Sequence, residues 1–282
     1  MSVFRAGSTA LITGGASGIG LAVAQLCVRH GMKVAVVDKN GETLGLAKTV
    51  LDSSDAEMFE ADVSKGEEWG VLKGKVEERF GGVDLLMLNA GVAGKGSWGD
   101  AEYFEKILQT NLFGVVNGLN TYIPTFQSRT SASPPSAIII TGSKQGITNP
   151  PGNPAYNASK AAVKTLAEHL SFDFKDKSTS VHMLVPGWTF TGLSGNAPGS
   201  MSKKPDGAWS ATQVADYMYE KIKEDKFYII CPDNDVTEET DKKRMLWSVG
   251  DIVNERPPLT RWRPEFKEQA EKWMAEVDVK KQ

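Results

Sequence analysis

The fold follows from Thr13-Gly14-Gly15-Ala16-Ser17-Gly18-Ile19-Gly20, a glycine-rich segment between an apolar run at residues 10–12 and a helical pattern at 21–26. Glycines at such a junction permit a tight turn and let a pyrophosphate approach the backbone, where the start of the helix offers free N–H groups and partial positive charge. The spacing G-x-x-x-G-x-G differs from G-x-G-x-x-G, and no Gly-Lys-Ser/Thr follows as in a P-loop. Its place between strand and helix predicts a dinucleotide site, and the alternative is a glycine turn without a ligand.

Short apolar runs alternate with helical stretches along the chain. We predict strands at residues 10–12, 34–37, 57–61, 84–88, 137–140, 181–185 and 227–230. These runs are apolar throughout, as expected for parallel strands covered by helices on both faces. Strand–helix alternation implies right-handed crossovers. We therefore expect an α/β fold, a doubly wound Rossmann-type three-layer sandwich whose mainly parallel sheet has about seven strands. Residues 1–282 would form one domain, with a core at about 8–231 and a C-terminal extension at about 232–282.

Composition narrows the function classes. The net charge of −3 gives no reason to expect nucleic acid or a membrane surface as a partner. No signal peptide and no apolar run of transmembrane length is evident, and Cys27 and Cys231 belong to no C-x-x-C motif, so we expect a reducing, cytoplasmic location without a disulfide. The histidines, His30, His169 and His182, are scattered. We expect no metal site, with each histidine at the surface or at a helix end.

The second predicted strand ends at Asp38, eighteen residues after Gly20. A carboxylate at this position can accept hydrogen bonds from adenine-ribose hydroxyls and would repel a 2′-phosphate. This favours NAD as the cofactor over NADP. The neighbouring Lys39 keeps NADP open, because a cation can bind a phosphate, and Asp38 could instead only cap a turn.

A Tyr–Lys pair supplies the candidate chemistry. Tyr156 and Lys160 are four residues apart, so a helix would place them on one face, and Ser143 lies thirteen residues upstream of Tyr156. We expect the Lys160 ammonium to lower the pKa of the Tyr156 phenol and make it an acid/base catalyst. The alternative is a solvated helix face.

Together these motifs resemble the short-chain dehydrogenase/reductase family over about residues 8–231. Asp62-Val63 and Asn89-Ala90-Gly91-Val92 match its segments after the third and fourth strands, and Pro186-Gly187-Trp188-Thr189-Phe190-Thr191 resembles its P-G-x-V-x-T segment, with Thr189 in place of valine. The resemblance implies these cofactor-binding residues: Gly14, Ser17, Gly18, Ile19, Gly20, Asp38, Asp62, Val63, Asn89, Ala90, Gly91, Tyr156, Lys160, Pro186, Gly187, Thr189 and Thr191.

The same resemblance implies a catalytic set of Asn111, Ser143, Tyr156 and Lys160. Tyr156 would exchange a proton with the substrate oxygen, and Ser143 would hydrogen-bond that oxygen. Lys160 would hold the nicotinamide ribose, and Asn111 would hold a water that relays protons to Lys160. It implies an NAD(P)-dependent oxidoreductase. It also implies a homodimer or homotetramer formed through the helices that bear Asn111 and Tyr156.

For the substrate we expect contacts with Gln145 and Trp188 and a neutral, moderately apolar ketone or secondary alcohol. Further lining candidates are Asn149, Pro150, Phe190, Leu193 and Trp98. Lys144 is the nearest cation, although it could face solvent. Residues 194–206 form a lid or an ordinary loop.

Other readings remain open from the residues alone. The chain could be a non-catalytic dinucleotide sensor or scaffold, or an enzyme that catalyses a non-redox step such as isomerisation. The tail carries Trp247, Trp262 and Trp273 and should pack on the main body or on a neighbouring subunit.

Overall fold

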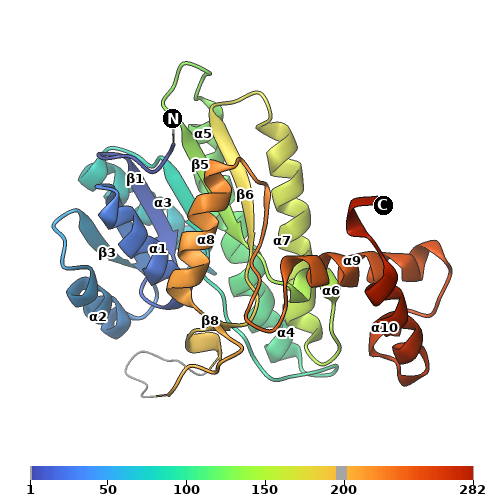
Figure 1. Cartoon of the computed structure of the whole chain (residues 1–282). Helices are drawn as coiled ribbons and strands as arrows, with labels where there is room; N and C mark the ends of the chain where they lie inside the picture. The colour runs from blue at the N-terminus through green and yellow to red at the C-terminus, as the bar shows by residue number, and fades with distance from the viewer. Residues whose placement is uncertain (1, 195–201, 282) are drawn as a thin grey trace.

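The computed structural model describes residues 2–194 and 202–281 (Figure 1). The strands of the main sheet are β1 (Thr9–Thr13), β2 (Lys33–Asp38), β3 (Ala56–Glu60), β4 (Leu85–Leu88), β5 (Ser136–Thr141), β6 (Thr179–Val185) and β9 (Tyr228–Ile230). Their order is β3-β2-β1-β4-β5-β6-β9, and these neighbours pair in parallel. The seven predicted strands are confirmed, with ends that differ by at most two residues.

Helices cover both faces of this sheet, which makes the doubly wound, three-layer Rossmann-type prediction correct (Figure 1). The helices of the core are α1 (Gly18–Arg29), α2 (Gly41–Leu51), α3 (Gly66–Phe80), α4 (Ala101–Leu108), α5 (Gly114–Gln127), α6 (Gln145–Thr148), α7 (Pro154–Asp173) and α8 (Ala211–Lys223). Helices α1, α2 and α8 share one buried cluster with the sheet, and α3, α5 and α7 share another. Strand β1 contributes side chains to both clusters, since Ala10 and Ile12 belong to the first cluster and Leu11 belongs to the second. This explains why the strands are apolar at successive positions.

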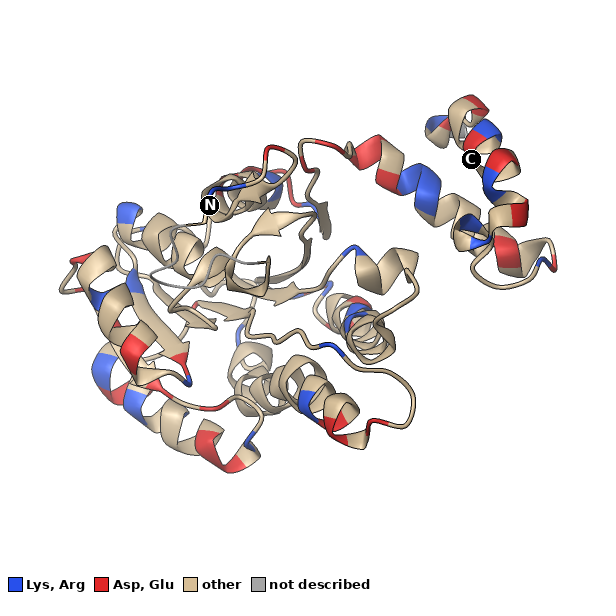
Figure 2. Cartoon of the chain, turned by 90° about the horizontal axis from the view of Figure 1, so that it is seen from below, with Lys and Arg blue, Asp and Glu red and all other residues tan. Residues whose placement is uncertain are grey.

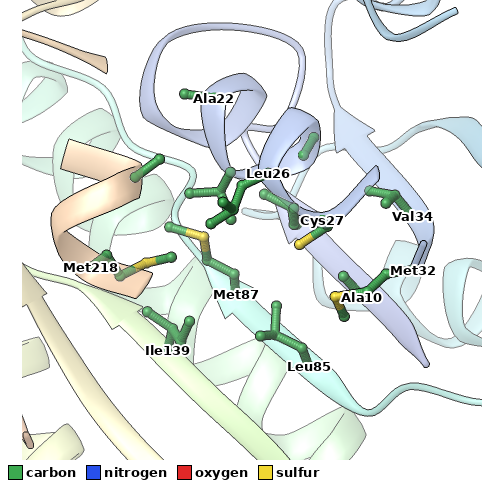
Figure 3. Close-up of a cluster of buried hydrophobic side chains, with 14 of the residues drawn as sticks. Ala10, Ala22, Leu26, Cys27, Met32, Val34, Leu85, Met87, Ile139 and Met218 are labelled. Carbon is green, nitrogen blue, oxygen red and sulfur yellow. The ribbon is translucent and has the colours of Figure 1, made fainter. Parts of the chain in front are cut away.

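The first cluster packs α1 and α8 onto the sheet. Figure 3 shows Leu26 and Cys27 of α1 above Leu85 and Met87 of β4, with Met218 of α8 close by. Burial raises the pKa of the Cys27 thiol to about 12, so this cysteine is an inert core residue. Cys27 and Cys231 are both buried and free.

The sheet order places the ligand-binding edge. Strand β1 lies between β2 and β4, so the chain leaves β1 toward one side of the sheet and returns to β4 on the other. At such a switch point the loops diverge, and a crevice opens beyond the carboxyl ends of the strands.

Several local features differ from the prediction. His182 is buried in β6 rather than at the surface, because Nδ1 lies 2.8 Å from the Lys226 carbonyl oxygen and Nε2 lies 2.8 Å from Ser180 Oγ. A short parallel ladder of β7 (Thr189–Phe190) and β8 (Trp209–Ser210) was not predicted. Of the expected lid at residues 194–206, only Ser194 and residues 202–206 belong to the described residues.

The C-terminal extension forms a helical arm, residues 238–281, that stands beside α6 and projects from the sandwich (Figures 1 and 2). Its elements are α9 (Glu238–Val253), η3 (Thr260–Trp262), η4 (Pro264–Phe266), α10 (Lys267–Glu276) and η5 (Val279–Lys281). Trp247 is buried, donates from Nε1 to Thr260 Oγ1 at 2.9 Å and packs on Trp273 with ring centroids 5.5 Å apart. Trp262 is partly exposed. The arm therefore has a small core of its own besides its contact with the main body.

Candidate active site

A cleft crosses the carboxyl ends of β1 to β6 and encloses about 660 Å³, within the usual range for a small-molecule site. The cleft is lined by these predicted residues: Gly14, Ser17, Gly18, Ile19, Asp38, Asp62, Val63, Asn89, Ala90, Gly91, Ser143, Gln145, Tyr156, Lys160, Pro186, Gly187, Trp188, Thr189 and Thr191. Gly20 and Asn111 are buried and do not line it. One cleft thus brings together segments that are far apart in the sequence.

The glycine turn is fixed against the segment after β4. Gly14 has φ +61°, and a Cβ there would lie 2.9 Å from the Ala90 Cα, so neither the conformation nor the space suits another residue. At Gly20 a Cβ would meet the Gly14 carbonyl oxygen at 2.2 Å. Asn89 donates from Nδ2 to the Thr13 carbonyl at 3.1 Å, and Thr13 Oγ1 accepts from the Asn89 N–H at 2.9 Å. The role of Gly20 is therefore close packing behind the cleft.

The start of α1 faces this cleft without a side-chain cap. Ser17 is its N-cap residue but makes no side-chain capping hydrogen bond, and the first turn holds no acidic residue. By contrast, Asn40, Ser210 and Thr237 cap α2, α8 and α9 through their side chains. Free N–H groups and the helix dipole favour an anion at this position. The residues present fit the pyrophosphate of a dinucleotide.

Asp38 marks the opposite end of the cleft, at the tip of β2. Its Oδ2 accepts from the Ala16 N–H at 3.4 Å, and its Oδ1 accepts from the Asn40 N–H at 3.3 Å. Lys39 also lines the cleft beside it and is exposed. Long hydrogen bonds from the backbone therefore hold the Asp38 carboxylate at the edge of the cleft, and the Lys39 cation lies in the same part of the lining.

Asp62 follows β3 and belongs to a turn of its own. Its Oδ1 accepts from the Ser64 hydroxyl at 2.7 Å and from the Ser64 N–H at 3.0 Å. Burial raises the pKa of this carboxyl, but the Ser64 hydrogen bonds and the charges of Lys39 and Lys65 outweigh it, so that the pKa lies below its usual range. Asp62 is therefore ionised at neutral pH and available as a hydrogen-bond acceptor.

The four candidate catalytic side chains come from three segments. Tyr156 and Lys160 lie on α7, Ser143 follows β5, and Asn111 lies in the π-helical turn η1 (Gln109–Phe113) between α4 and α5. The Lys160 side chain is buried, and its Nζ donates to the Thr141 carbonyl at 2.9 Å and lies 5.8 Å from the centroid of the Tyr156 ring. Tyr156 and Ser143 both line the cleft, and the Ser143 hydroxyl acts to lower the pKa of the Tyr156 phenol.

The Asn111 side chain binds the backbone of Val92. Its Oδ1 accepts from the Val92 N–H at 2.8 Å and its Nδ2 donates to the Val92 carbonyl at 2.9 Å. The amide thereby fixes the segment after β4. A Cβ added at Gly91 would lie 3.4 Å from Asn111 Oδ1 and 3.7 Å from Lys160 Nζ. Such π-turns occur frequently at functional sites. Here the turn carries a buried amide into contact with the backbone beside Lys160.

The electrostatics of Tyr156 differ from the expectation. Burial raises the pKa of Tyr156, and the Ser143 hydroxyl only partly offsets this. Burial lowers the pKa of Lys160 to about 8. The net shift of the Tyr156 pKa is therefore upward and not downward as predicted, because burial outweighs the groups that favour the phenolate.

The substrate end of the cleft is partly as expected. Gln145, Trp188 and Leu193 line it, whereas Asn149, Pro150, Phe190 and Trp98 do not. Lys144 does not face solvent, because its Nζ lies 3.2 Å from Asp233 Oδ2 and 2.6 Å from Asp241 Oδ2. These partners come from beyond β9 in the sequence, so no local pattern could reveal them.

A second missed group supports the start of α7. Asn153 lines the cleft and accepts a hydrogen bond from the Tyr103 hydroxyl, whose oxygen also accepts from the Ala155 N–H at 3.3 Å. Tyr103 on α4 thus holds the residues directly before Tyr156. Within the described residues no cluster of three metal-ligand side chains occurs, and no helix there is long and apolar enough to cross a membrane.

Comparison with known proteins agrees with this geometry. Residues 8–200 match the short chain dehydrogenase family model. The chain is 32% identical over 206 residues to 2,5-dichloro-2,5-cyclohexadiene-1,4-diol dehydrogenase LinX of Sphingobium indicum, covering 71% of this chain and 80% of that protein. It is also 32% identical to an NADP-dependent (R)-specific alcohol dehydrogenase of Lentilactobacillus kefiri, over 69% of this chain and 78% of that one. A short-chain dehydrogenase/reductase of Burkholderia phymatum, solved in complex with NAD, superimposes with a TM-score of 0.80 at 27% identity, covering 92% of this chain and 98% of that one.

The chain belongs to the short-chain dehydrogenase/reductase family. It is accordingly an NAD(P)-dependent oxidoreductase that acts on alcohol or carbonyl groups. The match to the family model covers β1 to β6, the residues that line the cleft and helix α7, while α8, β9 and the C-terminal arm lie beyond it.

Proposed function

We propose that this enzyme transfers a hydride between a nicotinamide cofactor and a neutral, moderately apolar ketone or secondary alcohol, with Tyr156 as the acid/base. The observation that carries the proposal is that one cleft brings Ser143 and Tyr156 together beside the buried Lys160. When bound, the cofactor supplies or accepts the hydride. The protein's own groups manage the proton and the charge on the substrate oxygen.

The direction of the Tyr156 pKa suits carbonyl reduction. A phenol whose pKa is raised by burial stays protonated at neutral pH and can donate its proton to the substrate oxygen. The Ser143 hydroxyl hydrogen-bonds the same oxygen and stabilises charge as it develops. In the direction of alcohol oxidation Tyr156 must first lose its proton, and a protonated Lys160 beside it favours the phenolate.

For the cofactor we propose NAD, with Gly14, Ser17, Gly18 and Ile19 around the pyrophosphate. Asp38 supports this choice, because a carboxylate at the end of β2 accepts hydrogen bonds from ribose hydroxyls and repels a 2′-phosphate. The similar Burkholderia phymatum structure contains NAD, whereas the Lentilactobacillus kefiri relative is NADP-dependent. Comparison of kcat/KM with NADH and with NADPH decides between the two cofactors.

The charge balance of the cleft supports a neutral substrate. Lys144 is neutralised by Asp233 and Asp241, and Lys160 is engaged by the Thr141 carbonyl. Among the described side chains at this end, Trp188 and Leu193 add apolar surface, and Gln145 adds a neutral polar contact. A carboxylate or phosphate on the substrate would find no unpaired lysine or arginine among these lining residues.

The experiment is a survey of turnover with purified protein, NADH or NADPH, and matched panels of ketones, secondary alcohols and their carboxylated analogues, followed by the absorbance of the reduced cofactor. We expect turnover of uncharged ketones and at least tenfold weaker kcat/KM for the carboxylated analogues. Cofactor binding without turnover across a broad panel would instead favour a dinucleotide sensor. Product formation without net cofactor consumption would indicate a non-redox reaction.

For assembly we propose a homodimer or homotetramer. The supporting observation is that Phe113 of η1 and Phe172 of α7 are large apolar side chains exposed on the segments that bear Asn111 and Tyr156. Light scattering of the purified protein measures the mass directly, and a monomer at micromolar concentration contradicts this proposal.

A further inference from the structure

The C-terminal arm reaches the catalytic end of the cleft through Lys144, the residue after Ser143. Lys144 Nζ lies 3.2 Å from Asp233 Oδ2 and 2.6 Å from Asp241 Oδ2, and Asp241 belongs to the first turns of α9. We propose that Lys144, Asp233 and Asp241 form a positioning cluster that holds Ser143 and the Trp188 wall for catalysis, so that the arm is part of the active site. The inference rests on the proposed function.

The cluster is largely withdrawn from water. The side chain of Lys144 is 15% exposed, that of Asp233 6% and that of Asp241 2%. Asp233 accepts a hydrogen bond from Lys144, whereas Asp241 meets the ammonium as an ion pair without hydrogen-bond geometry, and its Oδ1 lies 3.4 Å from Arg244 Nη1. Removing one member of a buried ion pair leaves an uncompensated charge and is strongly destabilising locally. A conservative change at one position should therefore displace the others.

Asp233 connects the cluster to the wall of the cleft. Its Oδ2 accepts from the Trp188 N–H at 3.1 Å, while its Oδ1 accepts from the Val236 N–H at 2.8 Å. At Gly187 a Cβ would lie 2.7 Å from Lys144 Nζ and 2.8 Å from Asp233 Oδ2, so the cluster lies directly against this backbone. The half-exposed Trp188 side chain is thus placed by a carboxylate whose partners are a lysine and the chain leading to the arm.

Lys144 connects the cluster to Ser143. Its N–H donates to the Pro186 carbonyl at 3.4 Å, and its own carbonyl accepts from the Thr148 N–H and from Thr148 Oγ1, each at 2.9 Å. Ser143 Oγ accepts from the Gln145 N–H at 3.2 Å. The backbone around Ser143 is therefore fixed on both sides of Lys144. A displacement of about 1 Å at a reacting group can lower a rate about a hundredfold.

The test is Asp241→Asn, which removes one charge and keeps the shape. We expect kcat for a ketone to fall about ten- to a hundredfold, while the Kd for NADH measured by fluorescence changes less than twofold. The matched control is Asp251→Asn on the same helix, whose carboxylate binds Arg256 and Thr260 inside the arm. This control should lower the melting temperature but leave kcat unchanged at temperatures where the protein is folded.

A double-mutant cycle separates positioning from a general loss of stability. Lys144→Gln leaves two carboxylates facing each other, so it should lower kcat more than Asp241→Asn does. In the double variant Lys144→Gln with Asp241→Asn, the fold-loss in kcat should be at least tenfold smaller than the product of the fold-losses in the two single variants. Independent effects, or full kcat in Asp241→Asn when the wild type is active, overturn the inference alone. A wild type that binds NADH and reduces no carbonyl overturns the proposed function, and the inference with it.

Discussion

Replacing Lys160 by methionine should change how the stability of the cofactor-free protein depends on pH. Burial lowers the pKa of Lys160 from 10.5 to about 8, which corresponds to about 3 kcal/mol. The Lys160 side chain is buried between β5 and α7, so solvent does little to screen this effect. Methionine keeps a similar stem and removes the titrating group.

The sign follows from proton linkage. Between about pH 8 and pH 10.5 the unfolded chain holds a proton at position 160 that the folded protein has released, so the free energy of unfolding rises with pH in this window. Below about pH 8 both states are protonated and the full cost of burying the charge is present. The wild type should therefore gain about 3 kcal/mol relative to Lys160→Met between about pH 7 and pH 10.5.

The assay is urea unfolding of both proteins at several pH values, followed by circular dichroism. Lys164→Met controls for the loss of a lysine on the same helix, since Lys164 pairs with Glu168 at the surface. If the difference in the free energy of unfolding between the wild type and Lys160→Met stays constant across this pH window, burial of the amine does not govern its protonation. The reasoning about the electrostatics of the site would then fail.

Three further substitutions test individual parts of the cleft. Asp38→Ala should raise the NADPH/NADH ratio of kcat/KM about tenfold, because it removes repulsion of a 2′-phosphate; an unchanged ratio contradicts its assignment. Ser143→Ala should lower kcat about 10²-fold with little change in NADH affinity, and equal losses in both would point to a distorted cleft. Gly18→Ala should weaken NADH binding about tenfold or more, since φ is +52° and Thr191 lies 3.2 Å from the new Cβ. Its control, Gly45→Ala, meets nothing within 4 Å in α2 and should add about 0.5–1 kcal/mol of stability.

The sequence predicts the fold well because its signals are local. Strands such as β1 are apolar at successive positions because alternate side chains enter the two buried clusters, and this pattern is visible without the structure. The glycines at 14 and 20 are required by a turn and a close approach that recur in dinucleotide-binding folds, so their spacing also carries information. Motifs at the ends of successive strands then necessarily meet at one edge of the sheet.

The parts that could not be predicted depend on distant packing. Lys144 has an ordinary surface-like sequence context, and its partner Asp233 is 89 residues away. The raised pKa of Tyr156 follows from burial, which sequence spacing to Lys160 does not report. In the same way, the amide of Asn111 is engaged by the Val92 backbone through a π-turn that no periodicity indicates.

The central claim is that the Tyr156 hydroxyl moves the proton that accompanies hydride transfer. The most direct measurement is the turnover of Tyr156→Phe with the best ketone and NADH, together with its NADH affinity and melting temperature. We predict that kcat falls about 10³-fold or more while NADH still binds and the protein stays folded. Undiminished turnover in a folded, NADH-binding Tyr156→Phe protein would contradict the account.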